Sequence, residues 1–579
     1  MILQALNDYY LRKQASPDPK DRLPEFGFEE KEILFIIELS KDGRLVNISD
    51  TREYLGKKQV AKRFLVAQSV KRASNIAANF LWDTAEYALG VDTKGKPDRV
   101  GLQHAAFRSK VKGLPASVQS DEGLVALNLF LDSMDLTALE RHPIWAEIKE
   151  TNPNISFRLH GDVELITQRP GLRVAPQSTE GAVQGWCMVT NQESEIERLH
   201  ASIKGVWGAQ SSGANIVSFN AEAFNSYGKE QGANAPLSSA IAFSYTTAIN
   251  HLLDRGSRQR VQVGDTSTVF WADKQHQLEN LVPDLFGEAP KDDPDRGTEA
   301  LKALYEATRT GKFAVGAPDD LFHVLGLAPN AARISIRFWE TATAKDIASR
   351  IQQHFEDLRI VHKPHEPEHM SLFRLLSGIA AQGKADNIPP NLGGDMARAI
   401  VEGLPYPNTL MNLAVQRCRA EQEVTYYRAA AIKAWLNRTI RRKNLNTTEP
   451  ETEYTPMLDL TNTNSGYRLG RLFAALEKTQ EDASPGLNAT IRDRYYGAAS
   501  STPAAVFSTL LRLKNHHIGK LHAGQAVNRE RLFGEIMGGL SKIPSHLPLP
   551  DQARFALGYY HQRQAFFTKS DKPTTEQPQ

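Results

Sequence analysis

The spacing of apolar residues changes near residue 345 of this 579-residue chain, and that change most limits the folds open to it. Before that point, short apolar runs alternate with helical patterns, which predicts an α+β region. The strand-like runs are Val163–Thr167, Gly185–Thr190, Ile216–Phe219, Thr268–Trp271 and Arg333–Trp339, and a helical pattern covers Ala235–Leu253. Helical periodicity dominates afterwards, most clearly in an i, i+3, i+4, i+7 stripe formed by Leu469, Leu472, Phe473 and Leu476. We expect an α+β N-terminal region followed by an α-helical C-terminal bundle.

Residues 31–50 predict a β-hairpin. The apolar runs Ile33–Leu39 and Leu45–Ile48 flank a turn that contains Asp42-Gly43, and an Asp-Gly pair in this position is a strong hairpin signal. Candidate linkers are Glu288–Thr298, Lys363–Glu368 and Asn444–Pro456. We therefore expect three regions: an α+β region over 1–345, a helical middle region with a linker over 346–456, and a helical domain over 457–579.

Charge is distributed unevenly, although the whole chain carries 69 Lys and Arg against 67 Asp and Glu. The stretch Tyr54–Trp82 contains no acidic residue but six basic ones. From Met457 to the C-terminus there are 15 basic against 10 acidic residues, while the rest of the chain has 54 against 57. Binding to phosphates needs a local positive field rather than a basic average, so both stretches are candidate nucleic-acid surfaces.

The two cysteines, Cys187 and Cys418, are too few to build a zinc site by themselves. We expect two buried thiols in a reducing compartment. The first ten residues lack the basic start and the long apolar run of a signal peptide, and no apolar run approaches the length of a membrane span. The expected location is the cytoplasm.

The segment Val70–Asp83 is the first candidate for base recognition. On a helix, Arg72, Asn75 and Asn79 would share one face. Arg and Asn side chains are suited to two-point contacts with guanine and adenine edges. The polar and basic residues that complete this candidate surface are Lys57, Lys58, Lys71 and Ser74. A solvated helix face is the alternative interpretation.

The second candidate is the stretch from Lys204 to Asn234, which is rich in glycine, small hydroxyl and amide residues. Such a loop brings backbone N–H groups close to phosphates or base edges. Gly208 and Gly213 have P-loop spacing, but the Lys-Ser/Thr pair that should follow is missing, so we do not expect nucleotide hydrolysis. The candidate contacts are Gln210, Ser211, Ser212, Asn215, Asn220, Lys229, Gln231 and Asn234. The alternative is a packed turn region in which Asn and Ser satisfy backbone groups.

Basic residues beside aromatic residues recur in the helical part of the chain. Arg438, Arg441 and Arg442 share a face of a predicted helix. A single nucleic-acid strand suits such a surface, because charges follow its backbone and aromatic rings stack on its bases. The other candidates are Arg468, Arg471, Arg492, Arg494, Arg512 and Lys514. Ordinary solvated helix faces are the alternative.

No group of residues in the sequence predicts catalysis. The adjacent His516 and His517, and His160 near Asp162, are not joined by carboxylates or thiols at a recognised metal-ligand spacing. A Gly-x-Ser-x-Gly motif is absent, and neither cysteine has a papain-like context. We expect no catalytic residue, metal or cofactor. The rival classes are a DNA nuclease subunit with its own catalytic site and a scaffold that does not touch DNA.

Eight segments together resemble the large subunit of the type I-C CRISPR Cascade surveillance complex, and the likeness runs nearly end to end. They are Met1–Tyr10, Lys71–Asp83, Ser212–Asn220, Val269–Ala272, Leu325–Arg333, Tyr467–Phe473, Arg492–Tyr496 and Gly558–Arg563. The resemblance implies a non-catalytic protein of RNA-guided defence that recognises the protospacer-adjacent motif in target duplex DNA. It also implies help with strand opening and with stabilising the R-loop, and a C-terminal part that resembles the Cascade small subunit.

The same resemblance implies the partners of the chain. They are the backbone, guide-handle and small subunits of Cascade, the guide RNA, the double-stranded target with its displaced strand, and a separate CRISPR helicase–nuclease. A membrane partner is not expected. Related genes also make the small subunit from an internal translation start, and Met457, which follows the linker Asn444–Pro456, is our hypothesis for such a start.

Overall fold

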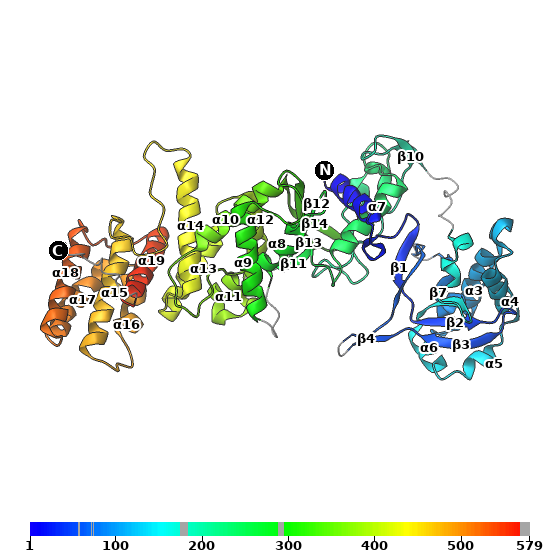
Figure 1. The fold of residues 1–579 in the computed structure, drawn as a ribbon, viewed down its shortest axis with the longest axis horizontal. Helices are drawn as coiled ribbons and strands as arrows, with labels where there is room; N and C mark the ends of the chain where they lie inside the picture. Colours follow the sequence, from blue (N-terminus) through cyan, green and yellow to red (C-terminus); the bar gives the residue numbers. More distant parts are fainter. Residues whose placement is uncertain are drawn as a thin grey trace, which may run out of the picture. The chain divides into compact units, whose positions relative to one another are not determined.

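The computed structural model describes residues 1–55, 58–70, 72, 75–173, 183–263, 265–287 and 294–567. The chain forms two compact units that alternate along the sequence (Figure 1). The large unit contains Met1–Ala5, Ser202–Ser218 and Ile249–Gln579, and the small unit contains Leu6–Ala201 and Phe219–Ala248. Among the described residues, no helix is long and apolar enough to cross a membrane.

The small unit is built on a four-stranded sheet with the strand order β3-β2-β8-β7. Its strands are β2 (Phe35–Leu39), β3 (Leu45–Asp50), β7 (Trp82–Thr84) and β8 (Asn154–Leu159). Strands β2 and β3 form the predicted antiparallel hairpin, while β2 and β8 run parallel. Gly43 has φ +78° in the hairpin turn, and a side chain there would collide with Leu129. The alternating residues Phe35 and Ile37 point to the core side of this sheet.

Helices cover that core side of the small unit. Phe107 and Phe130 project from two of these helices onto Phe157 of β8. The helices of the small unit are α2 (Ala85–Ala88), α3 (Pro97–Lys112), α4 (Glu122–Ser133), α5 (Leu136–Glu140) and α6 (Trp145–Thr151). Three strand pairs complete it: β1 (Phe28–Glu32) with β6 (Arg63–Ala67), β4 (Glu53–Leu55) with β5 (Lys58–Val60), and β9 (Gln184–Trp186) with β10 (Glu193–Glu195).

The large unit begins with an antiparallel sheet in the order β11-β12-β13-β14. The strands are β11 (Arg260–Val263), β12 (Thr266–Ala272), β13 (Leu321–Asn330) and β14 (Arg333–Thr343). A bulge interrupts the β13–β14 register between Gly326 and Leu327. The ring of Phe338 takes the space in which any side chain at Gly326 would lie, so the strand requires glycine at this position.

Helices α8 to α19 of the large unit all contribute buried side chains to one continuous apolar core. These helices are α8 (Leu278–Phe286), α9 (Pro294–Thr310), α10 (Ala344–Leu358), α11 (Leu372–Ile379), α12 (Leu392–Glu402), α13 (Asn408–Glu421), α14 (Tyr426–Asn444), α15 (Ser465–Ala483), α16 (Ile491–Ala499), α17 (Pro503–Ile518), α18 (Ala523–Gly538) and α19 (Leu549–Ala565). Helices α1 (Ile2–Gln14) and α7 (Ser239–Leu252) have residues in both units.

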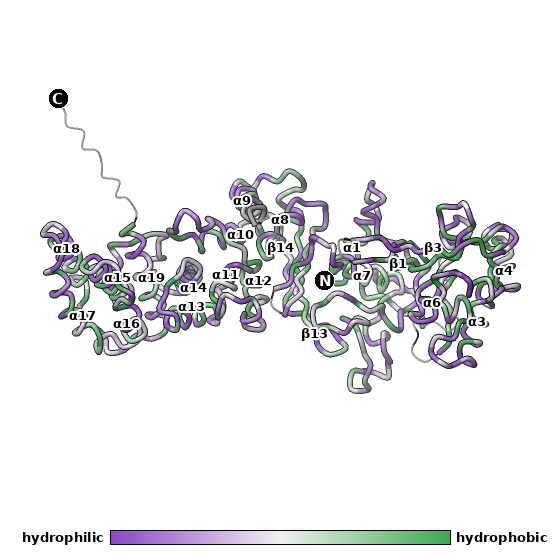
Figure 2. Tube along the Cα trace, turned by 90° about the horizontal axis from the view of Figure 1, so that it is seen from below, coloured by the Kyte–Doolittle hydropathy of each residue, from purple (hydrophilic) through white to green (hydrophobic). Residues whose placement is uncertain are grey.

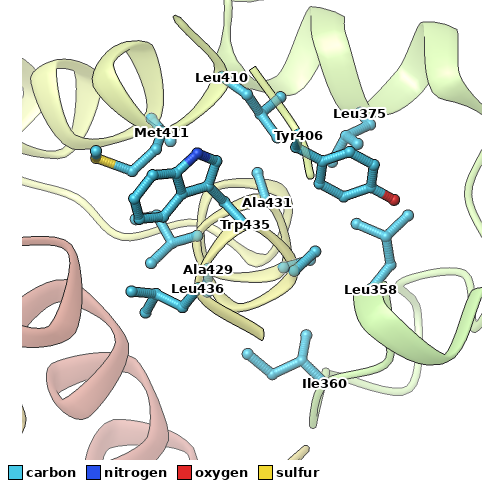
Figure 3. Close-up of a cluster of buried hydrophobic side chains, with 14 of the residues drawn as sticks. Leu358, Ile360, Leu375, Tyr406, Leu410, Met411, Ala429, Ala431, Trp435 and Leu436 are labelled. Carbon is cyan, nitrogen blue, oxygen red and sulfur yellow. The ribbon is translucent and has the colours of Figure 1, made fainter. Parts of the chain in front are cut away.

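Helix α14 lies in the middle of this core. Ala429 and Ala431 let neighbouring helices approach closely, and Trp435 fills the space beside Leu410 and Met411 (Figure 3). The helix is nevertheless not purely apolar, because hydrophobic and hydrophilic residues are mixed along it (Figure 2). Its buried polar residues must therefore find partners inside the protein.

The structure confirms most, but not all, of the predicted elements. Thr268–Trp271 lies in β12, Arg333–Trp339 lies in β14, and Ala235–Leu253 contains α7. The chain is mixed α/β with a helical C-terminal region, and no described residue after Thr343 is in a strand.

Three strand predictions are wrong in whole or in part. Val163–Thr167 is a loop that ends in a 3-10 turn, and β9 covers only the start of Gly185–Thr190. Ile216–Phe219 is irregular, because the loop before it makes only isolated bridges, from Ala214 to Ile203 and from Asn215 to Arg333. Apolar residues predicted a strand there, but no neighbouring strand extends alongside them.

Candidate nucleic-acid interface

The described residues of Val70–Asp83 do not form the predicted helix. The buried carboxylate of Asp83 accepts a hydrogen bond from the backbone N–H of Asn79 (2.8 Å) and pairs with the guanidinium of Arg72. The side-chain oxygen of Asn79 accepts a hydrogen bond from the backbone N–H of Val70 (2.9 Å). Side-chain hydrogen bonds to the backbone thus stabilise a loop in place of helical hydrogen bonds.

These contacts change the roles expected for the first candidate surface. Asn79 is only 5% exposed, and Arg72 also packs over the ring of Tyr87 at 3.9 Å, so both hold the loop in place. Asn75, by contrast, is exposed. Three other predicted contacts, Lys57, Lys71 and Ser74, lie outside the described residues, as does the side chain of Lys58. Among the described residues of this candidate surface, Asn75 has the exposed side chain, while Arg72 is partly buried.

The Gly/Ser/Asn stretch divides between the units after Ser218. In the large unit, Ile203 and Ala214 close a loop through two backbone hydrogen bonds of 2.8 and 2.9 Å. Gly213 has φ +94°, and a side chain there would meet the carbonyl of Ile203 at 2.9 Å. The loop between them exposes the polar side chains of Gln210, Ser211 and Ser212. We call residues 203–214 the tip loop.

The tip loop is fixed to the sheet beneath it. The backbone N–H of Trp207 donates to Oγ of the buried Ser267 on β12 (3.0 Å), and the N–H of Lys204 donates to the side chain of Asn250 (2.7 Å). The carbonyl of Asn215 accepts from the N–H of Ile334 on β14 (3.0 Å). The loop therefore presents its side chains from a set position rather than from a free segment.

The sequence stretches at the tip loop contain basic but no acidic residues. No acidic residue occurs from Arg198 to Ala221 or from Leu321 to Trp339, the two stretches that meet at this end of the sheet. The Asp265 carboxylate, which follows β11, pairs with Arg337 at 3.1 Å. A polyanion approaching the tip loop thus meets amides, hydroxyls and basic side chains.

In the small unit, the rest of the Gly/Ser/Asn stretch has a partly structural role. The amide of Asn234 accepts from the N–H of Ser226 (2.9 Å) and donates to the carbonyls of Lys229 and Gln231, so it fastens the loop. Gln231 accepts a hydrogen bond from Arg198 (3.1 Å). Asn220 and Lys229 are exposed.

Several of the predicted basic contacts on α14 and α15 are buried. Nε of Arg438 donates to Asp357 (2.7 Å), its Nη1 donates to two backbone carbonyls, and its plane lies over Tyr406. Arg471 is 0% exposed and donates to Glu535 (2.8 Å) and Gln562 (3.1 Å). Such guanidinium groups leave no surface for a phosphate.

Two further candidates of these helices are also engaged within the protein. Nε of Arg468 donates to the carbonyl of Asn462 at 2.7 Å, and its side chain is almost fully buried. Arg441 pairs with Asp357 (2.9 Å) and Glu453 (2.5 Å). Arg442 is the exposed member of the predicted Arg438, Arg441 and Arg442 face.

The last helices carry a different set of cations. Arg494 on α16 and Arg512 on α17 are exposed. Lys514 pairs with Glu530 (2.7 Å), and Arg492 lies 3.7 Å from the buried Glu477. The helical end of the chain thus offers Arg494 and Arg512 to solvent, while its other predicted contacts have carboxylate neighbours.

His160, one of the histidines considered as metal ligands, has a carboxylate as its hydrogen-bond partner. His160 hydrogen-bonds to Glu38 (3.0 Å), as Arg158 does (2.5 Å). Burial acts to raise the pKa of Glu38, but the hydrogen bonds from Ser49, His160 and Arg158 outweigh it and lower that pKa to about 2. Among the described residues, no three His, Cys, Asp or Glu side chains form a group suited to a metal ion. Cys187 and Cys418 are buried free thiols.

The sequence alone did not identify Trp207 as part of this surface. Its indole is 64% exposed although its backbone is fixed. The available signal was a tryptophan placed between Gly205 and Gly208 in a stretch without acidic residues.

The family model described as CRISPR-associated protein (Cas_Csd1) matches residues 6–567. The search of curated proteins gives no significant match.

Proposed function

Because the chain belongs to the Cas_Csd1 family of CRISPR-associated proteins, we propose that it is the non-catalytic large subunit of a type I-C Cascade complex. In this role it binds target duplex DNA beside the guide-matched sequence, recognises the adjacent motif and helps the strands to open. The guide RNA supplies most of the sequence specificity by base pairing, so the protein reads only a short motif.

One observation carries the DNA-binding part of this proposal. The tip loop presents Gln210, Ser211 and Ser212 from a backbone that is hydrogen-bonded to the sheet, in a stretch of sequence without acidic residues. Amide and hydroxyl groups make hydrogen bonds to base edges and phosphates, and a fixed loop pays little entropy when it binds. The exposed Asn75 and the exposed Arg494 and Arg512 supply further contacts.

The proposal assigns the remaining steps to partners. Family membership implies association with other Cas components and with nucleic acid. We propose that the backbone, guide-handle and small subunits hold the guide RNA, that the helical end of this chain holds the displaced strand, and that a separate helicase–nuclease docks after opening and cuts. Hydrolysis then belongs to that partner.

A motif-depletion experiment tests the proposal. The guide-loaded complex is presented with a library of target plasmids that differ only in the bases beside the matched sequence. The wild-type complex should select a few motifs, and the triple variant Gln210→Ala, Ser211→Ala, Ser212→Ala should lose affinity or selectivity. Equal binding to all motifs by the wild-type complex, or equal performance without this subunit, would refute the proposal.

The rival assignment as a nuclease subunit is tested directly. The purified chain is incubated with supercoiled plasmid and with Mg²⁺, Mn²⁺ or Zn²⁺, and nicked circles are measured. Metal-dependent nicking that co-purifies with the intact chain would overturn the non-catalytic role.

The hypothesis of an internal start at Met457 has its own test. The gene is expressed with the Met457 codon replaced by one that does not start translation. We expect a short C-terminal product to disappear while the full chain remains. Persistence of that product unchanged would exclude Met457.

A further inference from the structure

We propose that Trp207 is a stacking platform for an unpaired nucleic-acid base, next to the point where the target duplex opens. This inference rests on the proposed function and adds to it a residue and a kind of ligand. The indole is 64% exposed, which is unusual for so large an aromatic side chain, and the other exposed side chains of the tip loop are polar.

The backbone that carries the Trp207 indole is held in place by hydrogen bonds to the sheet. The N–H of Trp207 is held by Ser267, and Ser267 in turn donates to the side chain of Gln262 at 2.7 Å. Ser267 is completely buried in β12, so the anchor belongs to the sheet and not to another loop. Ile203 and Val206, which precede the indole in the loop, are buried and fix the base of the loop.

Glycines allow this close packing. Gly205 has φ +88°, and a side chain there would meet the carbonyl of Leu253 at 2.7 Å. Gly208 has φ +75°, and its missing side chain faces Pro329 near the end of β13 at 3.3 Å. The indole is therefore raised on a loop that is packed beneath and beside it, and little conformational freedom remains to be lost on binding.

The side chains around Trp207 in the tip loop indicate the kind of ligand that it binds. An exposed tryptophan also suits a protein partner, but such anchors normally lie within an apolar patch. Here the neighbours of the indole in the tip loop are the exposed Lys204, Gln210, Ser211 and Ser212. A nucleic-acid strand suits this combination of one aromatic face with amide and hydroxyl donors, in a loop whose own sequence contains no carboxylate, because rings stack on bases while the donors meet the backbone.

A second exposed tryptophan of the same chain, Trp186, has different neighbours. Trp186 on β9 is 63% exposed, almost the same fraction as Trp207. It lies among the exposed apolar side chains of Val183 and Met188, and Glu193 and Glu195 are on the strand that pairs with β9. Trp186 thus has the apolar and acidic surroundings that Trp207 lacks, and it is a matched control.

The experiment measures single-strand binding and strand opening separately. Binding of the purified full chain to a fluorescent mixed-sequence single strand is followed by anisotropy. Trp207→Ala should weaken binding by about 5- to 100-fold, the effect of losing one stacked base, while Trp207→Phe retains most of the affinity. Trp186→Ala should bind as the wild type does.

In the guide-loaded complex, the adenine beside the motif is replaced by 2-aminopurine, whose fluorescence rises when it leaves the base stack. Trp207→Ala should still bind the correct motif but should reduce this rise. Unchanged single-strand affinity in Trp207→Ala, or an equal loss in Trp186→Ala, would overturn the proposal. Loss of subunit assembly with intact strand binding would assign Trp207 to a protein contact instead. The single-strand measurement stands even if the complex shows no motif selectivity, so the two proposals fail independently.

Discussion

Arg438 on α14 and Arg471 on α15 were predicted from the same kind of pattern as Arg494 on α16 and Arg512 on α17, but the fold gives the two pairs opposite surroundings. Arg438 and Arg471 are buried, and each is paired with a carboxylate. Arg494 and Arg512 are exposed. The comparison shows that a cluster of cations in a sequence indicates a nucleic-acid surface only if the fold leaves those cations unpaired and accessible.

The reason for the difference is the cost of burying charge. A guanidinium inside the core is tolerated only when hydrogen bonds and an opposite charge replace its water. Asp357 supplies that charge to both Arg438 and Arg441, and it is itself almost inaccessible. On α16 and α17 the same side chain remains in water and keeps its capacity to bind phosphate.

The largest effect is expected at the buried pair. Arg438→Met leaves Asp357 buried with one of its two cationic partners, so we expect the free energy of unfolding of the large unit to fall by about 3–5 kcal/mol. Thermal and denaturant unfolding measure this. Arg442→Ala, on the exposed side of the same helix, should change it by less than about 0.5 kcal/mol. Equal losses in the two variants would remove the distinction between buried and exposed cations.

The next effect concerns pH. Burial lowers the pKa of Lys433 on α14 to about 8, from 10.5. Below pH 8 both the folded and the unfolded chain carry this proton; between pH 8 and 10.5 only the unfolded chain holds it, so stability rises with pH through this window. The rise amounts to up to about 3 kcal/mol. It should be absent from Lys433→Met, and the measurement is the difference between the two pH–stability curves. Parallel curves would contradict the assignment.

A smaller effect distinguishes, in the small unit, a residue predicted to contact DNA bases from one that stabilises the loop. Asn75→Ala should cost about 1–3 kcal/mol of binding to the preferred motif and relax its selection, without a change in unfolding temperature. Arg72→Ala should lower the unfolding temperature, because Asp83 loses its cationic partner. A stability loss in Asn75→Ala, or altered motif selection in a fully stable Arg72→Ala, would reverse these roles.

The smallest effect is expected at the exposed cations. Arg494→Ala and Arg512→Ala should each reduce the salt dependence of single-strand binding by a slope of about 0.7, with affinity losses of a few-fold and no loss of stability. The control is Arg398→Ala on α12, which removes a cation already paired with Glu402 (2.9 Å). A slope that stays constant in all three variants would show that the helical end does not contact phosphate.

The sequence predicted those features that depend on local pattern. The stripe Leu469, Leu472, Phe473 and Leu476 is buried in α15, since a single helix face decides its burial. The hairpin over 31–50 was predicted because its turn chemistry is local. The burial of Arg438 and Arg471 was not predictable in this way, because their partners Asp357 and Glu535 are 81 and 64 residues away.

The candidate site was predicted in part for the same reason. The i, i+3, i+7 spacing of Arg72, Asn75 and Asn79 fits a helix, and only the fold shows that Asp83 holds this segment in a loop. The sequence singled out the Gly/Ser/Asn stretch, whose role in binding stays a prediction, but it did not single out Trp207, because exposure is a property of the folded loop. Its binding role remains a prediction.

Because the two units alternate along the chain, the order of synthesis on the ribosome affects when each unit can fold. The polypeptide passes from one unit to the other after residues 5, 201, 218 and 248. The carbonyl of Ala5 accepts a hydrogen bond from the indole N–H of Trp271 (3.3 Å). The first five residues therefore lack this partner until β12, more than 260 positions later in the chain, has been synthesised. The tip loop likewise emerges before β12 and β14, to which it is fastened. An arrested or shortened nascent chain would expose that loop without its anchors, and the fixed geometry of the loop would come only with synthesis of the sheet.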